Sequence, residues 1–149
     1  MTDIKSIILA SASPRRRELL AQIGVRFEVL PAHISEVPQP EESAETYVQR
    51  MAREKAQAIA GSLEGDAVVL GADTEVVLDG RILGKPGDPS EAAAMLRSLS
   101  GRSHRVLTAV AVLSRGQDAL EALNVSTVTF AELDELWISR YVETGDPMD

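Results

Sequence analysis

Three consecutive arginines occupy residues 15–17, at the expected start of a helix. Ser13 is a suitable N-cap for that helix, and Pro14 suits its first position, where a missing N–H costs nothing. The first turn of a helix exposes unpaired N–H groups and the positive end of the helix dipole, so it favours anions over cations. The arginines therefore either face a bound anion or extend on their long stems into water.

Lys55 interrupts an apolar pattern with a positive charge. It lies on the same helical stripe as Val48, Met51, Ala52 and Ile59, where a core side chain would be expected. One interpretation is a lysine whose stem covers apolar surface while its ammonium reaches water. The other is that this stripe faces a cleft and the ammonium points at a ligand.

Asp73 follows the apolar run at residues 67–70 and Gly71. We expect it at the carboxyl end of a central strand, where open α/β sheets place their ligand crevices. There it could bind a divalent metal or accept a proton from water. The alternative is a turn aspartate that hydrogen-bonds its own backbone.

Lys85 and Glu36 lie in predicted loops, Lys85 among glycines and prolines and Glu36 in the proline-rich segment 31–42. Each is either a solvated loop residue or part of a site. Considered together with the three arginines, Lys55 and Asp73, these residues favour a polyphosphate ligand. A helix N-terminus, guanidinium groups, lysines and metal-binding carboxylates are all useful for that ligand.

The elements expected to position these residues alternate between strands and helices. Strands are predicted at residues 4–10, 25–30, 67–70, 106–113 and 124–130, with a hairpin over 76–83 turning at Asp79-Gly80. Helices are predicted at 14–23, 43–60, 89–99 and 133–142. The inward residues of the first helix would be Leu19, Leu20 and Ile23, and those of the last would be Leu133, Leu136, Trp137 and Tyr141. The pattern indicates an α/β domain with a mixed sheet flanked by helices.

Composition narrows the function classes. The 149 residues include 15 Lys and Arg against 23 Asp and Glu, a formal net charge of −8, which argues against a nucleic-acid or membrane surface. The chain has no cysteine, so a disulfide framework, a thiolate metal site and a cysteine nucleophile are excluded. Its apolar runs are too short for a leader or a membrane span, so a cytoplasmic protein is expected.

Five motifs, in order along the chain, resemble those of the Maf family of nucleoside triphosphate pyrophosphatases. They are LASASPRR at residues 9–16, YVQRMAREKA at 47–56, GADT at 71–74, GKP at 84–86 and LSGRSH at 99–104. The resemblance covers essentially the whole chain, 1–149, as one Maf-like domain. It implies the inosine-triphosphatase-like α/β fold, with two lobes around a cleft. It also implies hydrolysis of a nucleoside triphosphate to monophosphate and pyrophosphate with a divalent metal, Mg²⁺ or Mn²⁺, in a role of clearing unwanted nucleotides.

The resemblance also implies residue roles. Asp73 would be the proton acceptor that activates water, and Glu36 would join it around the metal. The phosphate-binding residues would be Ser11, Arg15, Arg16, Lys55 and Lys85. Arg15 and Thr74 are similar to the family branch that acts on dTTP and UTP; the branch that acts on 7-methyl-GTP has tryptophan and glutamine there, so Arg15 and Thr74 are candidate specificity residues.

Two departures from the family pattern bear on these expectations. The family usually has two acids where this chain has Ser35-Glu36, and relatives continue beyond Asp149 with further strands. A chain lacking the C-terminal part of the family fold is therefore expected, with a homodimer left open. The alternatives are a 7-methyl-GTP pyrophosphatase and a non-catalytic nucleotide-binding regulator of septum formation.

Overall fold

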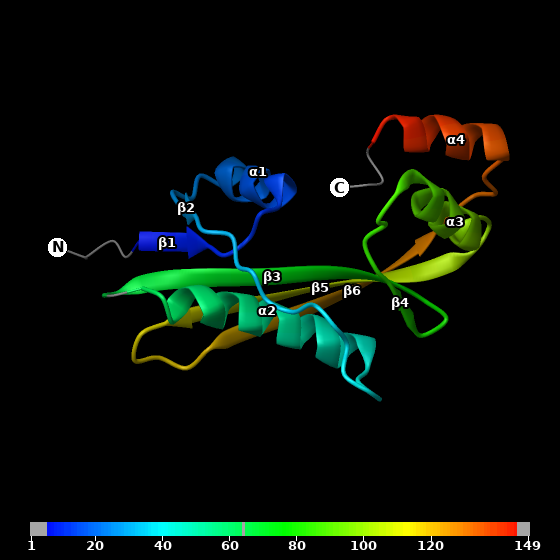
Figure 1. The fold of residues 1–149 in the computed structure, drawn as a ribbon. Helices are drawn as coiled ribbons and strands as arrows, with labels where there is room; N and C mark the ends of the chain where they lie inside the picture. The colour runs from blue at the N-terminus through cyan, green and yellow to red at the C-terminus, as the bar shows by residue number, and fades with distance from the viewer. Residues whose placement is uncertain (1–5, 64, 146–149) are drawn as a thin grey trace. The chain divides into compact units, whose positions relative to one another are not determined.

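The computed structural model describes residues 6–63 and 65–145. Within them, six strands form one sheet in the order β2-β1-β3-β5-β6, with β4 paired to β3 (Figure 1). β1 runs parallel to both β2 and β3, whereas β4 is antiparallel to β3. The strands are β1 Ser6–Leu9, β2 Glu28–Val29, β3 Ala67–Leu78, β4 Arg81–Leu83, β5 Ser103–Ser114 and β6 Leu120–Thr129. The predicted α/β fold with a mixed sheet is confirmed.

Three of the four described helices begin within one residue of the predicted start, and α4 begins at Glu135, two residues after its predicted start. Helix α1 spans Pro14–Gln22, α2 Ala44–Ala60, α3 Pro89–Leu99 and α4 Glu135–Glu143. The side chains of Ser13, Ser43 and Asp88 each accept a hydrogen bond from the backbone N–H three residues later, as N-caps do. Asp134 caps α4 in the same way. No helix in the described part of the chain is long and apolar enough to cross a membrane.

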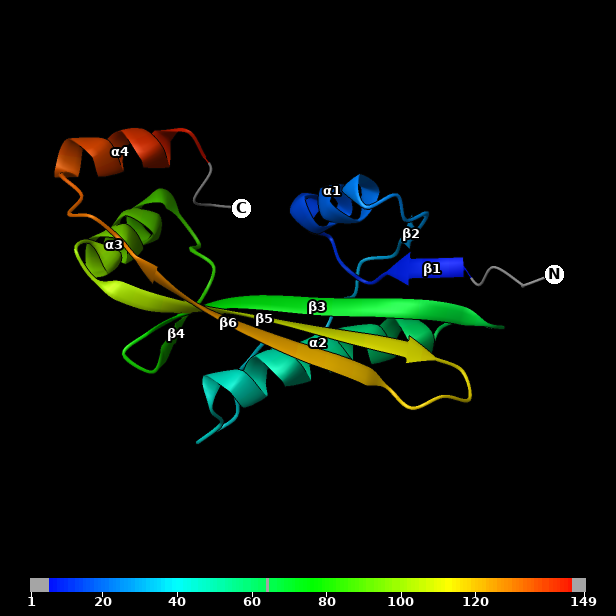
Figure 2. The same cartoon turned by 180° about the vertical axis from the view of Figure 1, so that it is seen from behind.

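The chain divides into two units, in agreement with the two expected lobes. The described part of the first unit comprises residues 6–74 and 108–124, and that of the second comprises 75–107 and 125–145. In the first unit, α1 and α2 lie on opposite faces of the sheet (Figures 1 and 2). In the second unit, α3 and α4 pack against each other. A cleft between the units stays a prediction.

The core of the first unit is built by α2 lying very close to β3. Helix α2 turns Val48, Met51, Ala52 and Ala56 inward, and each of them is fully buried. A side chain at Gly71 of β3 would collide with the Ala52 carbonyl oxygen and would lie 2.8 Å from the Ala56 nitrogen. Glycine is therefore required at this position because the helix backbone occupies the space of a Cβ.

The strand prediction around Asp73 was wrong in one respect. We expected a short strand ending near Leu70, but β3 continues without interruption to Leu78. In the sequence, Gly71 indicates the end of a strand. In the structure, it instead allows α2 to lie close to β3. Asp73 therefore lies inside β3, three residues beyond the last one paired with β1. The hairpin at Asp79-Gly80 is confirmed, with the positive φ angles of 52° and 78° that such a turn requires.

The predicted inward faces of α1 and α4 were wrong in part: Leu20, Leu133 and Tyr141 are half-buried, but the other predicted residues are exposed. Leu19 is 57% exposed and Ile23 72%, because the four-residue β1 and two-residue β2 flanking α1 offer little surface to cover them. In α4 the buried residue is Ile138, at 1% exposure. Leu136 lies two positions away, about 200° around the helix, and is consequently exposed. Trp137 is also largely exposed, and its ring stacks on Tyr141.

Candidate functional site

Lys55 connects two carboxylates in the first unit. Its ammonium lies 2.7 Å from Glu36 Oε1 and 3.1 Å from Asp73 Oδ1. The Lys55 side chain is 14% exposed and that of Asp73 6%, while that of Glu36 is 53% exposed. We call Glu36, Lys55 and Asp73 the Lys55 cluster. The ammonium is thus directed at carboxylates, and the interpretation of Lys55 as a lysine that merely reaches water was wrong.

The close packing of α2 on β3 explains this contact between residues 18 positions apart. Gly71 allows the helix backbone to touch the strand at Ala52 and Ala56, on either side of Lys55 in sequence. Asp73 is two positions after Gly71, and side chains two apart in a strand point to the same face. The Asp73 carboxylate therefore faces α2, and the ammonium reaches it. Asp73 is not the turn aspartate that was the alternative.

One oxygen of Asp73 is buried without a partner. Oδ2 makes no hydrogen bond to any residue that the structure describes, although it is shielded from solvent. A buried carboxylate oxygen without a partner costs free energy, and such atoms require an explanation in function or in a bound group. Asp73 therefore has one oxygen held by Lys55 and one available for a ligand or a proton.

A second chain of polar contacts involves Thr74, the residue that follows Asp73. The guanidinium of Arg16 donates from Nη1 to Ser11 Oγ at 3.2 Å and from Nη2 to Thr74 Oγ1 at 3.1 Å. The Thr74 hydroxyl in turn lies 3.1 Å from that of Thr108 on β5. We call Ser11, Arg16, Thr74 and Thr108 the Arg16 chain. Thr108 was missed because its predicted strand carried no motif; only the partner of Thr74 reveals it.

The remaining predicted phosphate ligands are solvent-exposed. Arg15 is exposed, whereas the neighbouring Arg16 is half-buried and turned toward Ser11 and Thr74. Lys85 is exposed in the loop after β4, in the second unit. Of the predicted residues, the structure thus joins Glu36, Lys55 and Asp73 in one group, and links Ser11, Arg16 and Thr74 in another. The parts assigned to Arg15 and Lys85 stay predictions.

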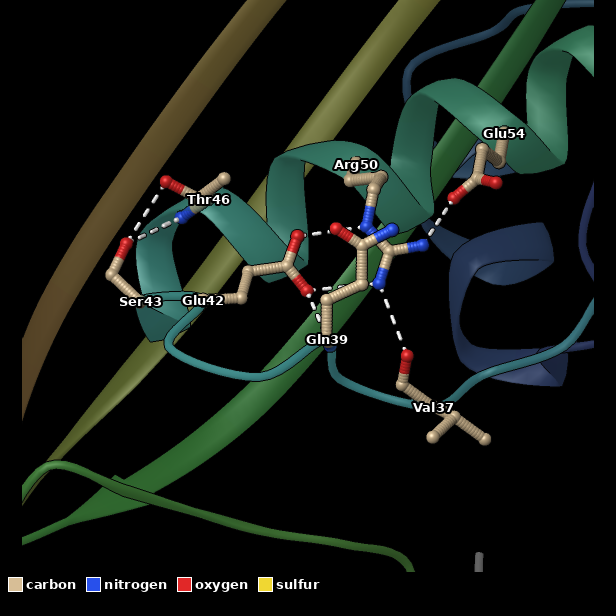
Figure 3. Close-up of polar contacts among 7 residues, drawn as sticks. All are labelled: Val37, Gln39, Glu42, Ser43, Thr46, Arg50 and Glu54. Atoms are coloured by element: carbon tan, nitrogen blue, oxygen red, sulfur yellow. Dashed lines mark hydrogen bonds and ion pairs between the residues drawn. The ribbon is translucent and has the colours of Figure 1, made fainter.

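The loop that carries Glu36 is fastened to α2 by Arg50 (Figure 3). Nε and Nη2 of Arg50 lie 2.7 and 2.9 Å from the two Glu42 oxygens. Nη1 donates to Glu54 at 2.7 Å, and Nη2 also donates to the Val37 carbonyl at 3.1 Å. We call these contacts the Arg50 clasp. Its hydrogen bonds lower the pKa of Glu42 from 4.5 to about 2.

His104, from the last of the five motifs, is buried in the second unit. Its ring meets that of Phe130 edge to face, with centroids 4.9 Å apart, and burial lowers its pKa. Nδ1 is buried without a hydrogen-bond partner among the residues that the structure describes. This environment favours the neutral imidazole.

Glu36 and Asp73 are the carboxylates expected to bind a metal ion. The described residues contain no group of three or more His, Cys, Asp or Glu side chains that could hold a metal ion. Glu36 and Asp73 nevertheless supply two carboxylates around one ammonium, and Asp73 keeps a free oxygen. Mg²⁺ is commonly bound by one or two carboxylates together with substrate phosphates. The donors present therefore fit a divalent ion that binds together with a phosphate group.

Solved structures with the same architecture confirm the class of fold. The Staphylococcus aureus Ham1 protein aligns with a TM-score of 0.56 at 14% identity, over 83% of this chain and 70% of that one. Ham1-like proteins thus share the fold, which is what was predicted.

The family is established by sequence. The family model described as Maf-like protein matches residues 6–149, and the chain belongs to this family. The dTTP/UTP pyrophosphatase of Escherichia coli (strain 536) is 54% identical over 97% of this chain and 73% of the relative. A nucleoside triphosphate pyrophosphatase of Shigella flexneri is 53% identical over the same shares.

Proposed function

We propose that this protein hydrolyses dTTP and UTP to the nucleoside monophosphate and pyrophosphate. The proposal rests on family membership and on the names of relatives that are more than half identical to it. The single structural observation that carries it is Asp73, buried in β3, with one oxygen on Lys55 and the other without a partner among the described residues. Buried, oriented carboxylates of this kind occur where proton transfer is needed.

Asp73 accepts a proton from a water molecule in the proposed reaction. The water oxygen forms a bond to the α-phosphorus, and the bond from that phosphorus to the oxygen bridging to the β-phosphate breaks. Pyrophosphate leaves with the electron pair of that bond. Lys55 fixes the Asp73 carboxylate through Oδ1, so that Oδ2 remains for the water. An acceptor that is held in place before the substrate binds increases the rate of the reaction.

The basic residues of the first unit bind the phosphates in this proposal. Arg16 is already oriented by Ser11 and Thr74, and it lies at the N-terminus of α1, where the helix N–H groups add to its charge. Arg15 joins it from the adjacent position. For Lys85, which lies in the second unit, a phosphate contact remains what the family resemblance implies. Bound phosphates thereby explain the placement of arginines in a first turn that disfavours cations.

Glu36 and Asp73 hold a divalent metal ion, Mg²⁺ or Mn²⁺, in the proposed complex. When bound, the ion supplies positive charge that offsets the charge developing on the phosphate oxygens. Glu36 is more than half exposed and so is accessible to an ion that enters with the nucleotide.

The pyrimidine branch is favoured by Arg15 and Thr74. Thr74 lies between the Arg16 guanidinium and the Thr108 hydroxyl, so its own hydroxyl has a hydrogen-bond partner on each side. A glutamine in that position, as in the 7-methyl-GTP branch, is longer by two atoms and would displace one of these partners. This observation supports dTTP and UTP over 7-methyl-GTP as substrates.

Pyrophosphate release from a panel of triphosphates tests the proposal. With Mg²⁺ present, dTTP and UTP should be the best substrates, ahead of 7-methyl-GTP, ATP and GTP. Preference for 7-methyl-GTP would assign the chain to the other branch. Absence of release from every nucleotide, with nucleotide binding retained, would favour a regulator without catalysis.

A further inference from the structure

We propose that Arg50 is a positioning residue, which holds Glu36 against Lys55 by fastening segment 36–42 to α2. This inference rests on the proposed function and assigns a role to a residue that touches neither the nucleotide nor the reacting water. It concerns how the Lys55 cluster is assembled.

Segment 31–39 has no helix or strand of its own to fix its course. Glu36 lies within it, and the Glu36 carboxylate is more than half exposed. An exposed ion pair contributes little by itself, since solvent screens the charges and two long side chains lose freedom. The contact between Glu36 and Lys55 therefore needs a second anchor on the segment.

Arg50 supplies that anchor with two of its side-chain nitrogens, Nε and Nη2. Its contact with the Val37 carbonyl fixes the backbone directly after Glu36, and its paired bonds to Glu42 fix the end of the segment. Glu42 also accepts the Gln39 N–H at 3.0 Å, so one carboxylate joins the segment to itself and to Arg50 (Figure 3). The Glu42 side chain is only 5% exposed, which reduces the screening that weakens surface ion pairs.

The helix that carries Arg50 also carries Lys55. Arg50 is held from its other side by Glu54, four residues on, and its guanidinium lies 5.6 Å from the Tyr47 ring centroid. The clasp and the lysine thus belong to one rigid element, five positions apart. Fastening the segment to this helix at Val37 and Glu42 places Glu36 at the ammonium of the same helix. The planar guanidinium suits this task because it can satisfy several acceptors in fixed directions, whereas a lysine cannot.

Hydrogen exchange of segment 31–42 tests the clasp without any activity measurement. Arg50→Gln should speed exchange of the amides in this segment, including those of Gln39 and Glu42. Arg50→Lys should also speed exchange of these amides, and it should disturb the fold less. Arg53→Gln is the matched control, since Arg53 lies on the same helix but pairs with Glu121 on β6. Unchanged exchange in both Arg50 variants would overturn the inference.

A double-mutant cycle tests the link to Glu36. Arg50→Gln should lower kcat/KM for UTP by about tenfold to a hundredfold, the usual effect of losing a residue that orients a metal ligand. It should also raise the Mg²⁺ concentration that gives half-maximal rate, as Glu36→Gln does. In the Glu36→Gln background the same change should cost less than about twofold, because the two residues act through one contact.

Equal losses in both backgrounds would overturn the positioning role and leave Arg50 as a general stabiliser of α2. Arg53→Gln should leave the rate and the Mg²⁺ dependence unchanged. If the parent chain releases no pyrophosphate from any triphosphate, the proposed function fails, while the exchange measurement still decides whether Arg50 holds the segment.

Discussion

Asp73 is unusual among the carboxylates that the structure describes because it combines burial with incomplete hydrogen bonding. Its two oxygens differ in surroundings: Oδ1 contacts the Lys55 ammonium, and Oδ2 has no partner among the residues described. A residue that served stability alone would gain by satisfying both oxygens. This asymmetry supports the proposed role of Asp73 as the proton acceptor.

Replacing Asp73 by asparagine should lower kcat for UTP by at least about a hundredfold, as expected for loss of a general base. The size of the side chain is retained, and Lys55 keeps Glu36 as its ion-pair partner. Steady-state pyrophosphate release is the measurement. Asp66→Asn, at the exposed position just before β3, serves as the control with unchanged rate. An Asp73→Asn variant with parental kcat would remove Asp73 from the role of base.

The sequence indicated candidate site residues more readily than it indicated the contacts that these residues make. Lys55 stood out because a charge broke an apolar stripe, and Asp73 because it followed an apolar run. The contact between them depends on Gly71 and on how closely α2 lies against β3, which no local pattern encodes. Thr108 carried no signal of its own and is recognised only through Thr74. Arg50 lies in one of the family-like motifs, but the motif does not show its contacts with Glu42 and Val37.

At the scale of elements, the packing of α2 on β3 is the feature on which the Lys55 cluster depends. Gly71→Ala should destabilise the protein by about 3 kcal/mol, the upper part of the range for overpacking, because the added Cβ meets helix backbone. It should also lower activity, since a displaced α2 separates Lys55 from Asp73. The midpoint of urea unfolding measures the first effect. Gly84→Ala, with open space around its Cβ, should not change that midpoint.

The Arg50 clasp should make stability depend on pH. The pKa of Glu42 is about 2 in the folded protein and ordinarily 4.5, so the stabilisation is complete above 4.5 and is lost as pH falls through 2. Glu42→Gln should therefore be less stable than the parent at about pH 7, with the difference shrinking toward about pH 2. Urea unfolding at several pH values measures this.

Glu135→Gln provides the comparison for that experiment. Arg97 also lowers the pKa of Glu135, but this pair is largely exposed, and solvent screens it. Its substitution should change the unfolding midpoint little at any pH. A constant difference between the parent and Glu42→Gln across the pH range would contradict the stabilising role of the Glu42 carboxylate.

Three of the four helix starts were well predicted, whereas the inward faces of the outer helices were predicted only in part. A cap depends on a serine or aspartate and its next three residues, which the sequence shows directly. The buried face depends on what packs over the helix. Leu19 and Ile23 of α1 have the apolar spacing of a core face and are exposed all the same.

At the scale of the whole molecule, three strands contribute to both units. β3, β5 and β6 each begin in one unit and end in the other. A break in one part of such a strand is transmitted along its backbone, so we expect a single unfolding transition. The chain has one tryptophan, Trp137 on α4 in the second unit, whereas α2 dominates the helix content of the first.

Tryptophan fluorescence and far-ultraviolet circular dichroism should consequently give the same unfolding midpoint in urea. Tryptophan fluorescence reports on the second unit, and circular dichroism reports on both units. Two separate midpoints would show that the units unfold independently. The exposed variant Leu19→Ser should leave the agreement between the two probes unchanged, because Leu19 contributes little to the core.

Lys55 already gives both carboxylates of its cluster a positive partner, so neither Glu36 nor Asp73 is an isolated charge when no metal ion is bound. Proteins whose folding depends on the free energy of metal binding unfold when a chelator removes the metal. This one should melt at the same temperature before and after EDTA treatment, since its own ammonium occupies the place of a counterion. The two ion pairs of Lys55 should therefore keep the ligand-free cluster in place without a metal ion.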